Sequence, residues 1–304
     1  MTQRIVTALA LLLGASASWG QDAGAELQRM AEALSRADYA GTVVFWRDGQ
    51  LDALRVRRAH GPSGPSQQVE RLTGPVQPYR QDAQGAQLGT GPLYVTESGA
   101  VATGDWAAPL QAAYELRLVG ADRVAGRDAR VVDAQARDAF RYSRRFWIDV
   151  ESGLLLRAMA IGADGIPVEQ WMFTDLVLQP APAAQDDSGM VSAEQPRNRF
   201  PVPRSADVAN TRFVVADAPR DFTLLLAAQQ QGSEHLVYSD GLAKVSVYVE
   251  TLPAQASILS GAQQRGALSV FGRVFDGLQV TVVGEVPPAT AERFAQGLAR
   301  RDGG

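Results

Sequence analysis

Cysteine is absent from the 304-residue chain, histidine occurs only as His60 and His235, and Lys244 is the single lysine. Without cysteine the chain can form no disulfide and offers no thiolate nucleophile, zinc-binding thiolate or lipidation site. Two histidines alone cannot build a multi-histidine metal site. These absences argue against most classes of enzyme. We therefore expect a binding protein with no catalytic residue, no metal and no cofactor.

A strong excess of charge is lacking as well. The chain has 29 Lys and Arg against 33 Asp and Glu, which gives a formal net charge of -4 with the two signs interspersed. Nucleic-acid-binding domains carry a basic patch, so nucleic acid is not an expected partner. With 46% hydrophobic residues, the composition is typical of a globular chain with room for about two domains.

Residues 1–20 are typical of a secretory signal peptide. Arg4 precedes an apolar run, residues 5–13, which is too short to span a bilayer. Small residues follow at Ala15, Ala17 and Gly20. Cleavage after Ala17 or after Gly20 satisfies the requirement for small residues at the cleavage site. The polar residues that follow Gly20 favour cleavage after Gly20. A buried core helix is the alternative. The signal peptide predicts export through the inner membrane to the periplasm.

The hydrophobic pattern predicts one short helix and then a large antiparallel sheet. Leu27, Met30, Ala31 and Leu34 lie on one helical face, and the helix is expected to end near Asp38. The period then changes to two, with turns such as 151–153 and 163–165 between runs, and gaps too short for crossover helices. The predicted strands are residues 41–46, 51–57, 67–73, 92–96, 113–119, 129–134, 140–149, 154–161 and 168–178.

A Pro- and Ala-rich stretch, residues 179–210, interrupts this pattern and is predicted to be a linker. A smaller domain follows. Its predicted strands are 222–227, 235–238, 244–250, 267–274 and 279–284, with a helix after Pro288 whose apolar stripe is Ala291, Phe294, Ala295 and Leu298. The domain boundaries are therefore 1–20, 21–178, 179–210 and 211–301.

Known catalytic and metal-binding patterns are not matched. His60 lies near Ser63, but the surrounding Gly/Pro turn lacks the strand-to-helix context of a nucleophile elbow. Asp186 and Asp187 fall in the linker, where nothing would bury them. The Asp-Gly pairs have no further carboxylates at calcium-loop spacing, so hairpin turns explain them better.

Arginines and aromatics are the informative residues. Strand periodicity puts neighbouring arginines on one face, where they could bind an anionic head group: Arg55, Arg57, Arg141 and Arg145. The alternative is a solvated face paired with Asp and Glu. Large apolar side chains on the same sheet could line a groove for acyl chains, although the sequence does not say which face points inward. The groove candidates are Val44, Trp46, Leu54, Val56, Phe146 and Trp171.

Several segments follow each other in a characteristic order. In the first domain they are Tyr39-Ala-Gly-Thr-Val-Val-Phe, the strand ending at His60, Glu70-Arg-Leu with Gly74-Pro, 114–118 running into 120–127, Arg137-Asp-Ala-Phe-Arg-Tyr, Phe146-Trp-Ile-Asp and Ser152-Gly-Leu-Leu-Leu-Arg. In the second domain they are Tyr238-Ser-Asp-Gly-Leu and Val283-Gly-Glu-Val-Pro-Pro. Together these segments resemble the RseB/MucB family of periplasmic regulators of the sigma-E type (AlgU-type) envelope stress response. The resemblance covers both domains and the signal peptide.

The resemblance implies an α+β, β-rich fold. The large domain would be a curved antiparallel half-barrel like the lipoprotein carriers LolA and LolB, with helices in its concavity, and the small domain would be α/β. It also implies binding to the periplasmic part of an inner-membrane anti-sigma factor of the RseA/MucA type. Such binding would protect that factor from the site-1 protease until lipid or lipopolysaccharide acyl chains, or mislocalised lipoproteins, release it.

The favoured hypothesis is therefore a non-enzymatic regulator. The candidate partner-binding element is the turn Tyr238, Ser239, Asp240 and Gly241, because an exposed turn is a poor place for core packing. A plain hairpin is the alternative. A lipid or lipoprotein carrier of the LolA type is the second hypothesis, and a hydrolase the third. A homo-oligomer is left open.

Overall fold

The computed structural model describes residues 15–61, 64–73, 107–179, 211–230, 232–252 and 258–301. The predicted strand 92–96 and nearly all of the predicted linker lie outside these residues. Within them, no helix is long and apolar enough to cross a membrane.

The first domain contains an eight-stranded, wholly antiparallel sheet in the order β3-β2-β1-β8-β7-β6-β5-β4. Strand β1 pairs with both β2 and β8, so the beginning and end of the domain meet inside the sheet. This confirms the predicted meander, with strand ends shifted by a few residues. The strands are β1 (Tyr39–Arg47), β2 (Gln50–Gly61), β3 (Gly64–Arg71), β4 (Tyr114–Val124), β5 (Arg127–Ala136), β6 (Ser143–Asp149), β7 (Leu155–Ile161) and β8 (Pro167–Leu178).

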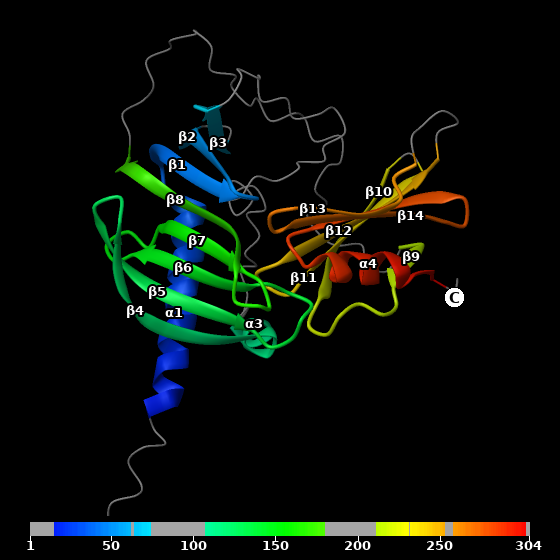
Figure 1. The fold of residues 1–304 in the computed structure, drawn as a ribbon, viewed down its shortest axis with the longest axis horizontal. Helices are drawn as coiled ribbons and strands as arrows, with labels where there is room; N and C mark the ends of the chain where they lie inside the picture. Colours follow the sequence, from blue (N-terminus) through cyan, green and yellow to red (C-terminus); the bar gives the residue numbers. More distant parts are fainter. Residues whose placement is uncertain are drawn as a thin grey trace, which may run out of the picture.

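Helix α1 (Ala15–Arg36) lies across one face of this sheet (Figure 1). Its predicted apolar face is buried, because Leu27, Met30 and Leu34 pack with the inward residues of the strands into one core cluster. The helix begins ahead of both cleavage sites considered, so it includes the last residues of the predicted signal peptide. A short helix that the sequence did not predict, α3 (Ala107–Ala113), leads into β4.

The second domain contains a six-stranded antiparallel sheet in the order β10-β11-β12-β15-β14-β13. Helix α4 (Pro288–Gln296) packs on it and buries Ala291, Phe294 and Ala295 (Figure 1). The strands are β10 (Thr223–Gln230), β11 (Ser233–Ser239), β12 (Lys244–Thr251), β13 (Gly261–Arg265), β14 (Leu268–Phe275) and β15 (Leu278–Gly284). The fold is thus β-rich, with open sheets and few helices, as expected.

Three short strands escaped the sequence analysis. Strand β9 (Phe213–Val215) pairs with β16 (Leu298–Arg300), and β13 pairs with β14. Leu298 was expected in the stripe of the last helix, but it belongs to β16, because α4 ends at Gln296 and Gly297 caps it. Strands of three to five residues carry too few alternations for the period to be recognised.

Candidate functional site

Four of the six groove candidates lie on the face of the first sheet that α1 covers. Leu54, Val56, Phe146 and Trp171 are all buried in the cluster that contains the α1 side chains. The Trp171 and Phe173 rings make a T-shaped contact at a centroid distance of 6.1 Å, so these two aromatics share a face as the two-residue period predicts. This face is therefore an apolar surface packed against a helix.

The prediction that Val44 and Trp46 line the same surface is wrong. Their neighbours Val43 and Phe45 are the inward residues of β1, so strand alternation directs Val44 and Trp46 to the opposite, outer face. Trp46 is accordingly 37% exposed, and it lies opposite the exposed Leu51 on β2. Sequence alone could not choose the inward face, because both faces of β1 carry large apolar residues.

Two of the four head-group candidates form ion pairs on the sheet. Arg55 contacts Glu70 at 2.7 Å and Arg145 contacts Asp133 at 2.5 Å. These ion pairs agree with the alternative prediction, in which the arginines lie on a solvated face and pair with Asp and Glu. Arg57 follows Arg55 on the same face of β2, opposite to the inward Leu54 and Val56.

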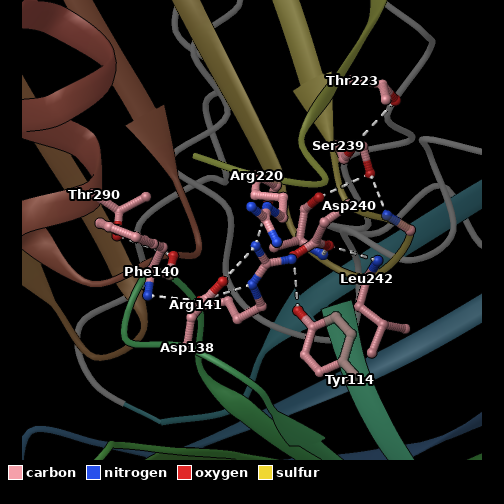
Figure 2. A network of polar contacts seen from close by, with 12 residues as sticks. Tyr114, Asp138, Phe140, Arg141, Arg220, Thr223, Ser239, Asp240, Leu242 and Thr290 are labelled. Atoms are coloured by element: carbon pink, nitrogen blue, oxygen red, sulfur yellow. Dashed lines mark hydrogen bonds and ion pairs between the residues drawn. The ribbon is translucent and has the colours of Figure 1, made fainter. Parts of the chain in front are cut away.

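Arg141 is the exception, and the prediction that it belongs to an exposed arginine face is wrong. It precedes β6 and its side chain is fully buried. The guanidinium binds both oxygens of Asp138 at 3.0 Å and donates to the carbonyl of Arg220 at 2.6 Å (Figure 2). It also meets Asp240 of the second domain at 3.0 Å. Arg141 therefore connects the two domains, and its buried guanidinium is occupied by these partners instead of a lipid head group.

The predicted partner-binding turn is likewise at the contact between domains. Tyr238, Ser239 and Asp240 are buried, which contradicts the assumption that the turn is exposed. The Tyr238 ring packs on Phe294 inside the second domain, and its hydroxyl accepts from the amide of Val215 at 3.0 Å. Gly241, which is exposed and has φ near +101°, lies beside Leu110 of α3. The turn is thus used for an intramolecular contact.

Asp240 is the centre of this contact, which we call the Asp240 contact: Tyr114, Asp138, Arg141, Arg220 and Asp240. Its carboxylate accepts hydrogen bonds from the Tyr114 hydroxyl at 2.9 Å and from Arg141 (Figure 2). The backbone amides of Leu242 and Ala243 also donate to it, at 3.0 and 2.7 Å. Burial raises the pKa of Asp240, whereas these amides and Arg141 act in the opposite direction. Burial also raises the pKa of Tyr114, so this phenol stays a hydrogen-bond donor.

A second contact joins the β13–β14 turn to the first domain. We call it the Gly266 contact: Arg47, Asp48, Glu169, Gly266 and Ala267. The amide of Gly266 donates to both oxygens of Asp48 at 3.1 Å, and the amide of Ala267 donates to Glu169 at 3.2 Å. Burial, followed by repulsion from Glu285, raises the pKa of Glu169 to about 7.

Further polar contacts connect the two domains. Arg144 forms an ion pair with Glu285 at 3.0 Å. The Gln264 amide donates to the Tyr142 hydroxyl at 3.1 Å, and the Thr290 hydroxyl donates to the carbonyl of Phe140 at 2.9 Å. The domain contact is therefore mostly polar, and its charged groups are largely shielded from water.

Sequence reasoning missed most of this site, although part of the signal was present. Four segments that carry the family resemblance, 114–118, 137–142, 238–242 and 283–288, supply Tyr114, Asp138, Arg141, Asp240 and Glu285 to the contact. Asp48, Glu169 and Gly266 could not be found in this way, because nothing in a single sequence shows which residues meet across two domains.

The two histidines lie in different domains. His60 is on β2 and its Nδ1 lies 2.6 Å from Asp38, and this hydrogen bond lowers the pKa of Asp38. His235 is on β11, stacked on Tyr248, and burial lowers its pKa to about 4. In the described part of the chain, no group of three or more His, Cys, Asp or Glu side chains could hold a metal ion.

The fold and the site define a class, a β-rich α+β protein in which two sheet domains are joined by a buried polar contact. The sequence of this chain matches two family models, the MucB/RseB N-terminal domain over residues 22–195 and the MucB/RseB C-terminal domain over residues 208–299. The chain belongs to the MucB/RseB family. It is 32% identical to the sigma factor AlgU regulatory protein MucB of Pseudomonas aeruginosa, with 95% of this chain and 96% of that protein covered.

Other relatives agree over the same length. The sigma-E factor regulatory protein RseB of Escherichia coli is 28% identical over 95% of this chain and 94% of that protein. The solved MucA/MucB complex of Pseudomonas aeruginosa matches with a TM-score of 0.63 and 26% identity, over 93% of this chain and 100% of that chain. A crystal structure of MucB matches with a TM-score of 0.65 and 26% identity, over 92% of this chain and 98% of that chain.

Proposed function

We propose that this chain is a periplasmic regulatory protein that binds the periplasmic segment of a membrane-bound anti-sigma factor of the MucA/RseA type. The observation that carries the proposal is that the likeness to MucB, including MucB solved with MucA, extends over both domains. A shared fold in one domain would support only a shared scaffold. The buried contact between the domains supports binding by a two-domain unit, because it holds the two domains together.

The consequence of binding is protection of the partner. A protease must take its substrate as an accessible extended segment in its own cleft. A segment held on this protein is not accessible in that way, so the first proteolytic cut waits until the segment is released.

Release by acyl chains is the second half of the proposal. The buried face with Leu54, Val56, Phe146 and Trp171 is the apolar surface that supports it. Helix α1 packs on this face, so an acyl chain that binds there must compete with α1 side chains. The remaining head-group candidates, Arg55, Arg57 and Arg145, lie on the opposite face of the sheet, so they do not support head-group binding at this surface. If lipid weakens partner binding, the partner must weaken lipid binding by the same factor.

A protection assay tests the proposal. The chain from residue 21 onward is mixed with the periplasmic segment of the anti-sigma factor from the same organism, and the site-1 protease is added. We expect the segment to be cut much more slowly in the presence of the chain, and lipopolysaccharide fragments to restore cutting. Cutting at an unchanged rate under saturating chain, together with transfer of lipoprotein between membranes, would favour the carrier hypothesis instead.

A further inference from the structure

The turn between β13 and β14 is held against the first domain by two backbone amides and two carboxylates. Gly266 donates to Asp48, and the next residue, Ala267, donates to Glu169. Glu169 is only 6% exposed and Ala267 is fully buried, so the bond between these two residues is shielded from water, whereas Asp48 is exposed. The turn also brings Ala267 into a small apolar cluster with Tyr142 and Ala160 of the first domain.

Gly266 makes this close approach possible. Its φ is +58°, and a Cβ atom at this position would lie 2.4 Å from Cδ of Arg47 and 2.6 Å from Oε2 of Glu169. Real Cβ atoms do not approach other atoms so closely. The turn therefore fits on Arg47 and Glu169 with no room for a side chain, and a small change at Glu169 is transmitted directly to the turn.

The charges around Glu169 come from every element packed on it. Arg47 ends β1 and Asp48 begins the following turn, Arg144 is on β6, Arg265 ends β13 and Glu285 follows β15. The arginines also interact with groups other than Glu169. Arg144 forms an ion pair with Glu285. Arg47 lies over the Phe45 ring at 4.8 Å and is repelled by Arg265. The Tyr142 phenol also lies within electrostatic range of Glu169.

We propose that the Gly266 contact is a proton-sensitive clasp between the two domains, which holds while the Glu169 carboxyl is neutral and loosens when it ionises. A neutral carboxyl keeps its carbonyl oxygen as acceptor for the Ala267 amide and places no second negative charge near Glu285. Ionisation releases one proton to solvent and leaves a buried charge that water would solvate better once the turn moves away.

The sign of the pH dependence follows from the two states. In the closed contact, burial raises the pKa of Glu169 to about 7, against an ordinary value of 4.5 when the side chain is in water. The closed state therefore binds a proton that the open state does not bind between these pH values. Closure is strongest at or below about pH 4.5 and is progressively lost as the pH rises through about 7. This clasp does not depend on the identity of any partner.

The absence of cysteine allows a direct test by energy transfer. Two exposed residues, Ala163 in the first domain and Thr251 in the second, are replaced by cysteine and labelled with a donor and an acceptor dye. In the otherwise native chain, we expect the closed-to-open ratio to fall by on the order of tenfold or more between about pH 5 and about pH 8. In Glu169→Gln, which keeps the acceptor but cannot ionise, we expect the closed distance at both pH values.

Glu151→Gln is the matched control, since Glu151 belongs to the same domain and its side chain is 85% exposed. This variant should follow the native pH profile. The clasp is ruled out by either of two results: a native distance that does not change with pH, or a Glu169→Gln profile that coincides with the native one.

Discussion

Each of the two named contacts between the domains buries a carboxyl group, Asp240 in one and Glu169 in the other. The two groups differ in how many hydrogen bonds and opposite charges offset the cost of burial. At the Asp240 contact the carboxylate receives four hydrogen bonds, one of them from the buried guanidinium of Arg141. At the Gly266 contact, within the part of the chain that the structure describes, Glu169 receives one backbone amide and has Glu285 as a neighbour.

The difference teaches which contact is permanent and which responds to conditions. A buried carboxylate surrounded by donors is costly to break, because the groups left behind are buried and polar. A buried carboxylate with few donors is held by shape and by its protonation state. We therefore expect the Asp240 contact to keep the domains together and the Gly266 contact to respond to pH.

The largest expected effect is at Arg141. Replacing it by methionine (Arg141→Met) keeps an apolar stem but removes the charge from Asp240, which must then protonate or remain buried without its partner. We expect a loss of about 3–5 kcal/mol in the free energy of unfolding at neutral pH. Urea unfolding followed by circular dichroism measures it.

Arg117→Met is the control for this variant. Arg117 is exposed and pairs with Glu115 on the same strand. Exposed pairs contribute about 0–1 kcal/mol, so the two substitutions should differ severalfold. Equal losses in the two variants would contradict the view that the Asp240 contact carries most of the domain association.

An intermediate effect is expected at Gly266. Gly266→Ala and Gly277→Ala place a Cβ on turns of the same sheet with φ values of +58° and +74°, but nothing lies within 4 Å of the Cβ at position 277. In both variants an alanine at positive φ lowers the free energy of unfolding by about 1 kcal/mol. Only Gly266→Ala should lose about 1–3 kcal/mol more from the clash with Arg47 and Glu169. Thermal unfolding of the two variants separates these contributions, and equal melting temperatures would mean that the turn is not tightly held.

The smallest effect is expected at Tyr114. Tyr114→Phe removes one of the four hydrogen bonds to Asp240 and leaves the ring in the core, so we expect a loss of about 1.5–3 kcal/mol at most. The same substitution in an Asp240→Asn background should cost less, because the charge that strengthens the bond is gone. A double-mutant cycle in urea measures the coupling, and a coupling energy near zero would show that the hydroxyl does not act through Asp240.

The sequence predicted the local structure well and the contacts between distant segments poorly. The period of two located the strands longer than five residues, and the Asp276-Gly277 turn joins β14 to β15 as its residues indicate. The same period put Val44 and Leu54 in one candidate groove, because it does not say which face is inward. The turn 238–241 was expected to be exposed because the sequence does not show which distant residues cover it. Arg141, which contacts Asp240, is 99 residues away along the chain.

The central claim is that the chain, as a two-domain unit, binds the periplasmic segment of an anti-sigma factor. Isothermal titration of the chain from residue 21 onward with that segment tests it most directly. The account predicts saturable binding with a Kd of about 1 μM or tighter, equivalent to roughly 8 kcal/mol of binding free energy. A folded chain that gives no binding heat at several temperatures, with the segment raised to about 100 μM, would contradict it.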